Sequence, residues 1–285
     1  MKGLIFRLNN FFIAIVVTGL IIGCKRKVHV LKSPPHYNFS TVFIDKLDLK
    51  IKEISGIAWD KDRNVFIVHN DESGKVFFLN KETKIVQTEV TFGGKGDYED
   101  VAVANGSIYV LRSDGLITKV MQDSTGKGYG VEVGDLDISG SKDFEAMYYD
   151  DIRKALIIIC KNCAMDSKST VSAFAFYPDS IGFDPKPVYT INADEIRNLS
   201  PKKTSKFQPS AVAIHPVLNK LFIVSSASNL LVIADRDGNV ESVYYLSPKL
   251  FPQPEGIAFK QNGDMYISNE GVTAKSTLLK FVYKP

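Results

Sequence analysis

The sequence predicts an all-β protein that folds as a single β-propeller of five four-stranded blades. The first observation is a short segment that occurs five times, in which a small or acidic residue precedes a small residue and an apolar run. Its copies are centred on Ser55, Glu99, Glu145, Ser210 and Glu255, at intervals of 44, 46, 65 and 45 residues. Such a period is typical of propeller blades, which repeat every 40 to 50 residues or so. The second observation is that strand-like runs of β-branched and aromatic residues follow each copy.

Each repeat is expected to supply four strands, of which the recurrent segment is the innermost. Small residues such as Gly56, Ala102 and Gly256 suit this position, because the sheets crowd together towards the axis. Second strands are predicted at 64–70, 107–113, 154–162, 220–226 and 264–270, and third strands at 75–80, 116–121, 170–177, 230–235 and 277–283. Fourth strands are predicted at 85–92, 129–134, 187–191 and 240–246.

The fifth repeat has no fourth strand of its own, and this deficit indicates how the ring closes. We expect the segment from Tyr37 to Leu47 to supply the missing strand, which would leave no wide open sheet edge. Residues 194–207 occupy much of the 65-residue interval and are predicted to form a helical or irregular excursion. The alternative is a sixth blade, although two blades in this interval would have only about 32 residues each.

Composition and missing motifs exclude several classes of protein. A chain with 45% hydrophobic and 24% charged residues is ordinary for a globular protein. A net charge of +3 is too small for a nucleic-acid-binding protein. Three cysteines cannot form a four-cysteine zinc site. No GxSxG, HExxH, GxGxxG or P-loop motif is present, so the prediction leans away from an enzyme.

The N-terminal residues predict a membrane-anchored protein. Lys2 and Arg7 precede a 12-residue apolar run, Phe11 to Ile22, which is too short to cross about 30 Å of hydrocarbon. This run ends in IIGC, which resembles the lipobox of bacterial lipoproteins and implies lipidation of Cys24. The predicted organisation is a signal peptide at 1–23, a lipidated tether at 24–36 and the propeller at 37–285. An uncleaved anchor is the alternative.

The predicted location is the bacterial cell envelope, with the protein held to the membrane through lipid on Cys24. Lys25 follows the cysteine, and by resemblance to enteric sorting rules this favours the outer membrane, facing the periplasm. The tether contains four basic residues and a proline pair without apolar periodicity, which is typical of an extended linker.

Several segments in one order resemble the SdiA-regulated family of cell-envelope proteins. They are EISGIAW, HNDESGKVF, GDYEDVAV, IYVLRSDGLI and PEGIAF, and the resemblance extends over nearly all of residues 37–285. It implies a propeller fold but no particular substrate, reaction or catalytic residue.

Polar residues are expected to gather at one central mouth, because the loops that enter the first strand and leave the second strand of every blade lie on the same face. The candidate ligand or ion site consists of Glu53, Asp97, Glu99, Asp143, Glu145, Glu255, Asn70, Asp71, Arg112, Asn162 and Asn269. Related positions hold Ser55, Gln208, Ser210, Gln253, Ser113, Asp114, Ser226 and Glu270.

Carboxylates that converge must bind a cation, pair with basic side chains or hold protons. Glu99, Glu145 and Glu255 are the candidate metal ligands, and calcium is the candidate ion because it accepts many oxygen ligands. Two alternatives remain. The glutamates could accept hydrogen bonds from the backbone of the neighbouring blade, or Arg112 and Lys161 could neutralise them.

The cysteines and histidines offer little chemistry. Cys160 and Cys163 are predicted to form a local disulfide or remain free thiols, rather than to bind metal or act in redox catalysis. His69 is interpreted as a strand-end residue rather than a general base, and His215 as a surface residue in a turn on the opposite face.

These observations predict an envelope lipoprotein whose propeller mouth binds a partner protein, a small polar ligand or a cation, without catalysis. The alternative is a calcium- or other metal-dependent hydrolase, similar to propeller lactonases or phytases. In that enzyme the cation would polarise an ester or phosphoryl oxygen, and Glu99, Glu145 or Glu255 would hold the ion or act as base.

Overall fold

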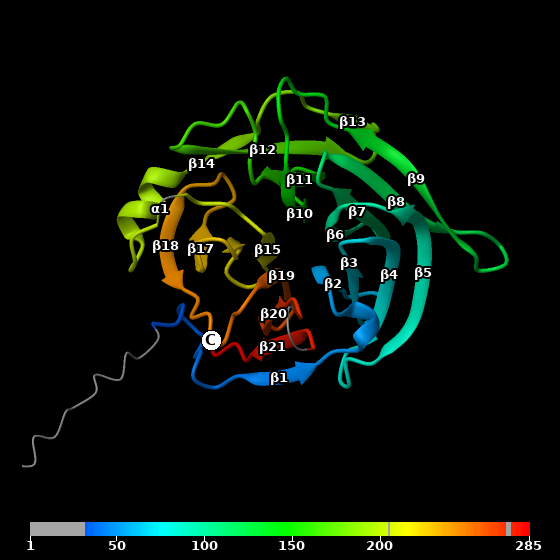
Figure 1. Ribbon diagram of the computed structural model, residues 1–285, viewed down its shortest axis with the longest axis horizontal. Coiled ribbons are helices and arrows are strands. Elements are labelled where there is room, and N and C mark those ends of the chain that lie inside the picture. Colours follow the sequence, from blue (N-terminus) through cyan, green and yellow to red (C-terminus); the bar gives the residue numbers. More distant parts are fainter. Residues whose placement is uncertain (1–31, 205, 272–274) are drawn as a thin grey trace, which may run out of the picture. The chain divides into compact units, whose positions relative to one another are not determined.

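The computed structural model describes residues 32–204, 206–271 and 275–285, which form five blades arranged in a ring (Figure 1). Blade 1 contains β2 (Ile54–Asp60), β3 (Val65–Asn70), β4 (Ser73–Asn80) and β5 (Val86–Lys95). Blade 2 contains β6 (Tyr98–Ala104), β7 (Ser107–Arg112), β8 (Leu116–Gln122) and β9 (Gly128–Asp135). Blade 4 contains β15 (Ala211–His215), β16 (Lys220–Ser225), β17 (Leu230–Ala234) and β18 (Val240–Tyr245). The five-blade prediction is confirmed, and the six-blade alternative is wrong.

Blade 3 has a divided outer edge. Its inner strands are β10 (Phe144–Asp150), β11 (Ala155–Cys160) and β12 (Thr170–Tyr177). Two short strands share the outer side of β12: β13 (Gly182–Phe183) pairs with its end and β14 (Tyr189–Asn192) with its beginning. Helix α1 (Ala193–Leu199) follows β14 and confirms the excursion predicted at 194–207. The Asn192 side chain caps this helix by accepting hydrogen bonds from the N–H groups of Asp194 and Glu195.

Blade 5 closes the ring as predicted. It contains β19 (Pro254–Phe259), β20 (Met265–Asn269) and β21 (Thr277–Phe281), and β1 (Phe43–Lys46) pairs antiparallel with β21 as the outermost strand. The short 3-10 helix η1 (Leu49–Ile51) leads from β1 to blade 1. Tyr37 fastens the N-terminal side of this segment, because its hydroxyl lies 2.6 Å from both the Gly263 carbonyl and His215 Nε2.

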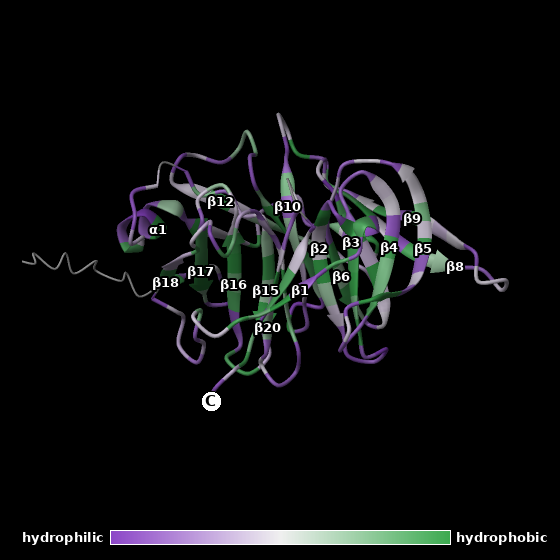
Figure 2. Cartoon of the chain, turned by 60° about the horizontal axis from the view of Figure 1, so that its bottom comes forward, coloured by the Kyte–Doolittle hydropathy of each residue, from purple (hydrophilic) through white to green (hydrophobic). Residues whose placement is uncertain are grey.

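The core lies between the blades. Blades 1 and 5 meet at Phe66 and Tyr266, whose ring centroids are 4.6 Å apart. Figure 2 shows the apolar strands inside the blades and hydrophilic loops at their ends. At Gly56 on the innermost strand of blade 1, a Cβ atom would lie 2.5 Å from Asp100 Oδ1, so only glycine fits between these blades.

Turns on the face opposite the predicted mouth share one hydrogen-bonding pattern. The Asp60 and Asp150 carboxylates each accept N–H groups two and three residues further along the chain. In blade 4 His215 Nδ1 has the same role, because it accepts the N–H groups of Val217 and Leu218. The prediction that His215 is a surface residue is wrong: it is fully buried, and burial lowers its pKa to about 4.

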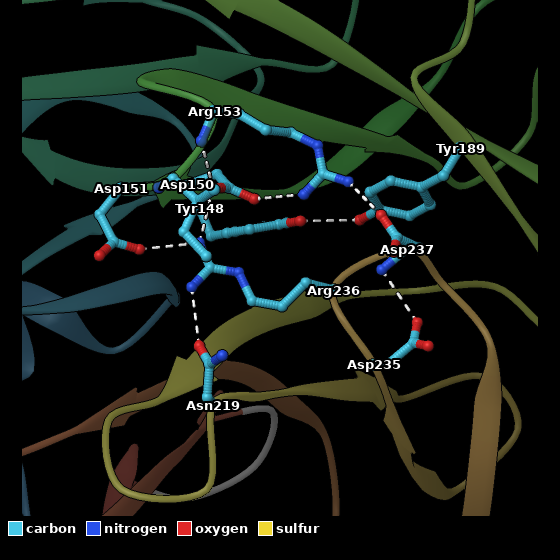
Figure 3. Close-up of polar contacts among 10 residues, drawn as sticks. Tyr148, Asp150, Asp151, Arg153, Tyr189, Asn219, Asp235, Arg236 and Asp237 are labelled. Atoms are coloured by element: carbon cyan, nitrogen blue, oxygen red, sulfur yellow. Dashed lines mark hydrogen bonds and ion pairs between the residues drawn. The ribbon is translucent and has the colours of Figure 1, made fainter.

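A polar cluster joins blades 3 and 4 on that opposite face (Figure 3). The buried Asp150 carboxylate accepts hydrogen bonds from Arg153 at 2.7 Å and from Arg236 at 2.6 Å. Arg236 comes from the turn between β17 and β18, so this contact crosses the blade boundary. Beside it, the hydroxyl groups of Tyr148 and Tyr189 lie 2.9 Å apart.

The predicted signal peptide, Cys24 and the first part of the tether lie outside the described residues. Among the helices of the described part, none is long and apolar enough to span a membrane.

Candidate functional site: the central mouth

Backbone hydrogen bonds define the mouth where each first strand begins. The N–H group of the residue that leaves a second strand donates to the carbonyl of the residue that enters the first strand of the same blade. These pairs are Asp71 to Glu53, Ser113 to Asp97, Lys161 to Asp143 and Glu270 to Gln253, with N···O distances of 3.3, 2.9, 2.8 and 2.9 Å. Four blades therefore present equivalent side chains at one rim.

A β-bulge directs each of the three glutamates away from its sheet. In blade 2, Tyr98 pairs with Arg112 and Asp100 with Leu111, so Glu99 has no partner in the ladder. The same register shift leaves out Glu145 in blade 3 and Glu255 in blade 5. Bulges re-aim side chains and are frequent beside functional sites. The shared acidic position of the repeat is therefore the bulged residue of the innermost strand.

The three glutamates line a single cavity of about 520 Å³. Seven carboxylates but only two lysines belong to this cavity: Asp71, Asp97, Glu99, Asp143, Glu145, Glu255 and Glu270 against Lys142 and Lys161. Lys142 is already paired with Asp135 at 3.0 Å, and Asp135 does not line the cavity. The mouth therefore carries a large excess of negative charge.

Burial, together with nearby carboxylates, raises the pKa values of several acids of the mouth. Burial raises the pKa of Glu99 to about 8, and the neighbouring carboxylate of Asp97 contributes further. Burial also raises the pKa of Glu255 to about 7, and Asp71 and Glu270 are raised by burial and by nearby acids. Protons thus supply part of the positive charge that the side chains lack.

Lys161 is the internal counter-ion of the mouth. Its ammonium group pairs with Glu145 and lies 4.0 Å from Asp143. The loop that carries it is closed by a disulfide between Cys160 and Cys163, one of the two states, disulfide or free thiols, that the sequence left open. Among the described residues, Cys160, Cys163 and Asp166 form the one group with three potential metal-ligating atoms within 4.8 Å of one another. Because the two sulfur atoms are bonded to each other, this group is not a thiolate metal site.

Hydrogen bonds between the innermost strands involve other side chains than the glutamates. Ser55 Oγ donates to the Glu99 carbonyl at 2.7 Å, and Ser210 Oγ donates to the Pro254 carbonyl at 2.9 Å. The buried Asp100 carboxylate accepts the Met147 N–H group of the next blade at 2.7 Å. Asp100, rather than the adjacent Glu99, has the inter-blade role that the sequence left open for the acids.

Several predicted residues lie outside this cavity. Asn70 accepts the Ser73 hydroxyl, Arg112 pairs with Asp114 at 2.7 Å, and Asn162 accepts the Lys206 ammonium at 3.0 Å. Asn269 is buried and donates to the Leu250 carbonyl at 3.3 Å. Glu53 is near enough to raise the pKa of Asp71, although it does not line the cavity.

Two basic residues differ from the sequence-based expectations, whereas His69 agrees with them. Arg112 does not neutralise the mouth, whereas Lys161 does. Lys142 was not anticipated, and its position directly before Asp143 was the only available signal. His69 is fully buried, accepts the Gly56 N–H group at 3.1 Å and has a pKa lowered by burial to about 4. It is a structural strand-end residue, as interpreted from the sequence.

The fold and the site together define a class, the five-bladed β-propeller with an acidic central mouth. Within that class the chain belongs to the SdiA-regulated family, whose model matches residues 34–272. No curated protein matches the sequence significantly.

Solved structures share the fold at low sequence identity. The chain is similar to glutaminyl cyclase of Myxococcus xanthus, with 12% identity, a TM-score of 0.56 and coverage of 84% of this chain and 94% of that one. It is also similar to the soluble aldose sugar dehydrogenase of Escherichia coli, with 12% identity, a TM-score of 0.52 and coverage of 86% and 100%. A gluconolactonase of Xanthomonas campestris has 12% identity, a TM-score of 0.50 and coverage of 85% and 90%. These similarities support the propeller architecture alone.

Proposed function

We propose that this protein is a binding protein of the bacterial cell envelope whose central mouth takes a positively charged ligand without catalysis. The observation that carries the proposal is the uncompensated charge of the mouth, seven carboxylates against two lysines in one cavity. A cationic ligand would replace the protons on Glu99 and Glu255, whose pKa values are about 8 and 7. Binding would therefore release protons near neutral pH.

An organic cation fits the mouth better than a bare metal ion. Calcium takes six to eight oxygen ligands at about 2.3–2.6 Å. In the described part of the chain, no three carboxylate residues of the mouth bring one oxygen each to within 4.8 Å of one another. A cavity of about 520 Å³ has room for a small polar molecule that presents an ammonium or guanidinium group. Such a group forms charge-assisted hydrogen bonds with several carboxylates at once.

The test is titration calorimetry of the mature protein with a primary alkylamine, hexylamine, at pH 7.5 in two buffers with different ionisation enthalpies. We expect binding accompanied by proton release, because Glu99 and Glu255 lose protons when the ammonium enters. The double variant Glu99→Gln/Glu255→Gln should lose most of the affinity. Glu89→Gln is the matched control, because Glu89 lies on β5 and pairs with Lys50 and Lys75 outside the mouth. Undetectable amine binding to the wild type would refute the proposal.

The metal-dependent hydrolase stays as a second candidate because of one observation. A general base works best when its pKa is close to the operating pH, and the pKa of Glu255, about 7, meets this condition. Under this candidate, calcium chloride should raise the melting temperature and chelator should lower it, with the response abolished in the variant lacking Glu99, Glu145 and Glu255. Lactones and phosphate esters would be assayed with and without the ion. A melting temperature that does not change with calcium would exclude the metal-dependent hydrolase.

The anchored location is part of the same proposal. Acyl chains on Cys24 would hold the propeller at the envelope, with residues 25–36 as the tether. Mass spectrometry of the N-terminal peptide should detect a lipidated cysteine, and the Cys24→Ala variant should leave the membrane fraction. Sucrose-gradient separation of the two membranes would test the predicted outer-membrane location.

A further inference from the structure

A second cavity adjoins the acidic mouth and has the opposite charge. It has a volume of about 510 Å³ and shares Lys161 with the mouth. Lys168 and Lys206 also line it, against the single acid Asp166. Since Lys161 lines both cavities, they are neighbours on the same face of the propeller.

Two lysines of this second cavity, Lys168 and Lys206, lack acidic partners in the described part of the chain, whereas Lys161 is paired within the mouth. The Asp166 carboxylate is occupied by the Ser172 hydroxyl at 2.6 Å and by the Ser172 N–H group at 3.2 Å. Lys206 contacts only the neutral Asn162 side chain, and in the described part of the chain neither Lys168 nor Lys206 forms an ion pair. The cavity is therefore positive where the mouth is negative.

Apolar side chains lie beneath these charges. Val171, Ala193 and Phe207 line the second cavity and are almost completely buried. The middle part of a ligand could lie against this closed apolar floor while its anionic end reached the lysines. Two cavities of opposite sign side by side complement a molecule that carries both charges.

We infer that the ligand is an elongated zwitterion, with its ammonium group among the mouth carboxylates and its carboxylate between Lys168 and Lys206. This inference rests on the proposed function and names the class of ligand that the same site would take. Lys161 lies between the two ends, and the ligand ammonium would compete with it for Glu145. Freed from that pair, the Lys161 ammonium would contact the anionic end of the ligand.

The test compares ω-amino acids, from 4-aminobutanoate to 8-aminooctanoate, with alkylamines of equal carbon number by titration calorimetry. We expect at least one chain length for which the amino acid binds tenfold or more tightly than its amine. The double variant Lys168→Gln/Lys206→Gln should lose this preference and still bind the alkylamine, because it leaves the mouth intact. Both lysines are exposed, so the fold should tolerate the changes. Lys186→Gln is the charge-matched control, an exposed lysine between β13 and β14.

The outcomes separate this inference from the proposed function. If alkylamines bind but no amino acid exceeds its amine, the zwitterion is refuted and the cation-binding mouth survives. A preference that persists in the double variant also refutes it, because the anionic end would then lie elsewhere. If neither series binds, both proposals fail.

Discussion

Two groups of buried carboxylates lie at opposite faces of this propeller, and their surroundings differ. At the junction of blades 3 and 4, burial alone would raise the pKa of Asp150. Hydrogen bonds from the Arg153 backbone and from the Arg153 and Arg236 side chains outweigh burial, and the pKa of Asp150 lies below its usual value. At the mouth, burial prevails and the pKa of Glu99 rises to about 8.

The comparison separates an acid whose ionised form the fold stabilises from acids whose ionised form the fold disfavours. The lowered pKa of Asp150 means that its ionised form favours the folded state, because Arg153 of the same blade and Arg236 of the next blade both pair with it. Glu99 and Glu255 cost stability when ionised, since a single lysine serves several carboxylates. A cationic ligand would remove that cost, and part of the binding free energy would come from this relief.

Removal of the cross-blade arginine should have the largest effect. Arg236→Met leaves the buried Asp150 with Arg153 as its remaining guanidinium partner, and we expect a loss of about 3 kcal/mol in the free energy of unfolding. Urea denaturation at pH 7 measures it. The double variant Asp150→Asn/Arg236→Met should recover part of the loss, because no uncompensated charge remains. A loss below about 1 kcal/mol would mean that this cluster is not structurally important.

Neutral substitutions of the mouth glutamates should increase the free energy of unfolding at high pH, the opposite of the change expected for Arg236→Met. The folded-state pKa of Glu99, about 8, exceeds its ordinary value of 4.5, so the folded protein binds more protons between these values. The wild type should therefore lose stability as the pH rises from about 4.5 through 8. At pH 9 the Glu99→Gln/Glu255→Gln variant should be more stable than the wild type by about 1–2 kcal/mol, a figure reduced for solvent screening in the open mouth. Unfolding curves at pH 5 and pH 9 measure this difference, and equal stabilities at pH 9 would contradict it.

A substitution in the N-terminal segment that closes the ring should have a moderate effect on the free energy of unfolding. Tyr37→Phe removes the hydroxyl between Gly263 and His215, and we expect a loss of about 1–2 kcal/mol, because two buried polar groups lose their partner. His215 adds a pH dependence, since its folded-state pKa of about 4 lies below the ordinary 6.5. Its contribution should be complete above pH 6.5 and should be lost as the pH falls through 4. A Tyr37→Phe variant as stable as the wild type at pH 7 would disprove this fastening role.

An exposed acid should show the smallest effect. Glu89 pairs with Lys50 and Lys75, both at 3.1 Å, on the outer strand of blade 1. Glu89→Gln should change the free energy of unfolding by less than about 0.5 kcal/mol, because water and salt screen such pairs. Denaturation at low and high salt measures it. A change as large as that of Arg236→Met would show that exposure does not separate the two kinds of acid.

The period of the repeat was sufficient to predict the ring and its closing strand. Five copies of a strand-forming unit that lack one final strand leave a single sheet edge to be completed, and β1 completes it. The shared position of the repeat also identified Glu99, Glu145 and Glu255 as residues of one cavity. These features could be predicted because they follow from the spacing of the repeats along the chain.

The residues that follow the second strand of each blade at the mouth could not be predicted from the spacing of the repeats. Each innermost strand of blades 1, 2, 3 and 5 begins with a register shift, so the facing residue on the second strand cannot be read from spacing. Ser113 leaves its strand as expected, whereas the positions expected for Asn70, Asn162 and Asn269 are held by Asp71, Lys161 and Glu270. The positive cavity was also missed, because its lysines come from two loops of irregular length, one between β11 and β12 and one between α1 and β15.

Closure by β1 also has a consequence for synthesis. Lys46 is made 231 residues before Thr277, the first residue of its partner strand. At about 5–20 residues per second, β1 waits roughly 10 to 50 seconds for that partner. Besides the exposed Phe43 and Ile44, the strand contains Asp45 and Lys46, and charges on an edge strand discourage it from joining a foreign sheet. The first strand of the ring is thus the last to gain its neighbour in a sheet.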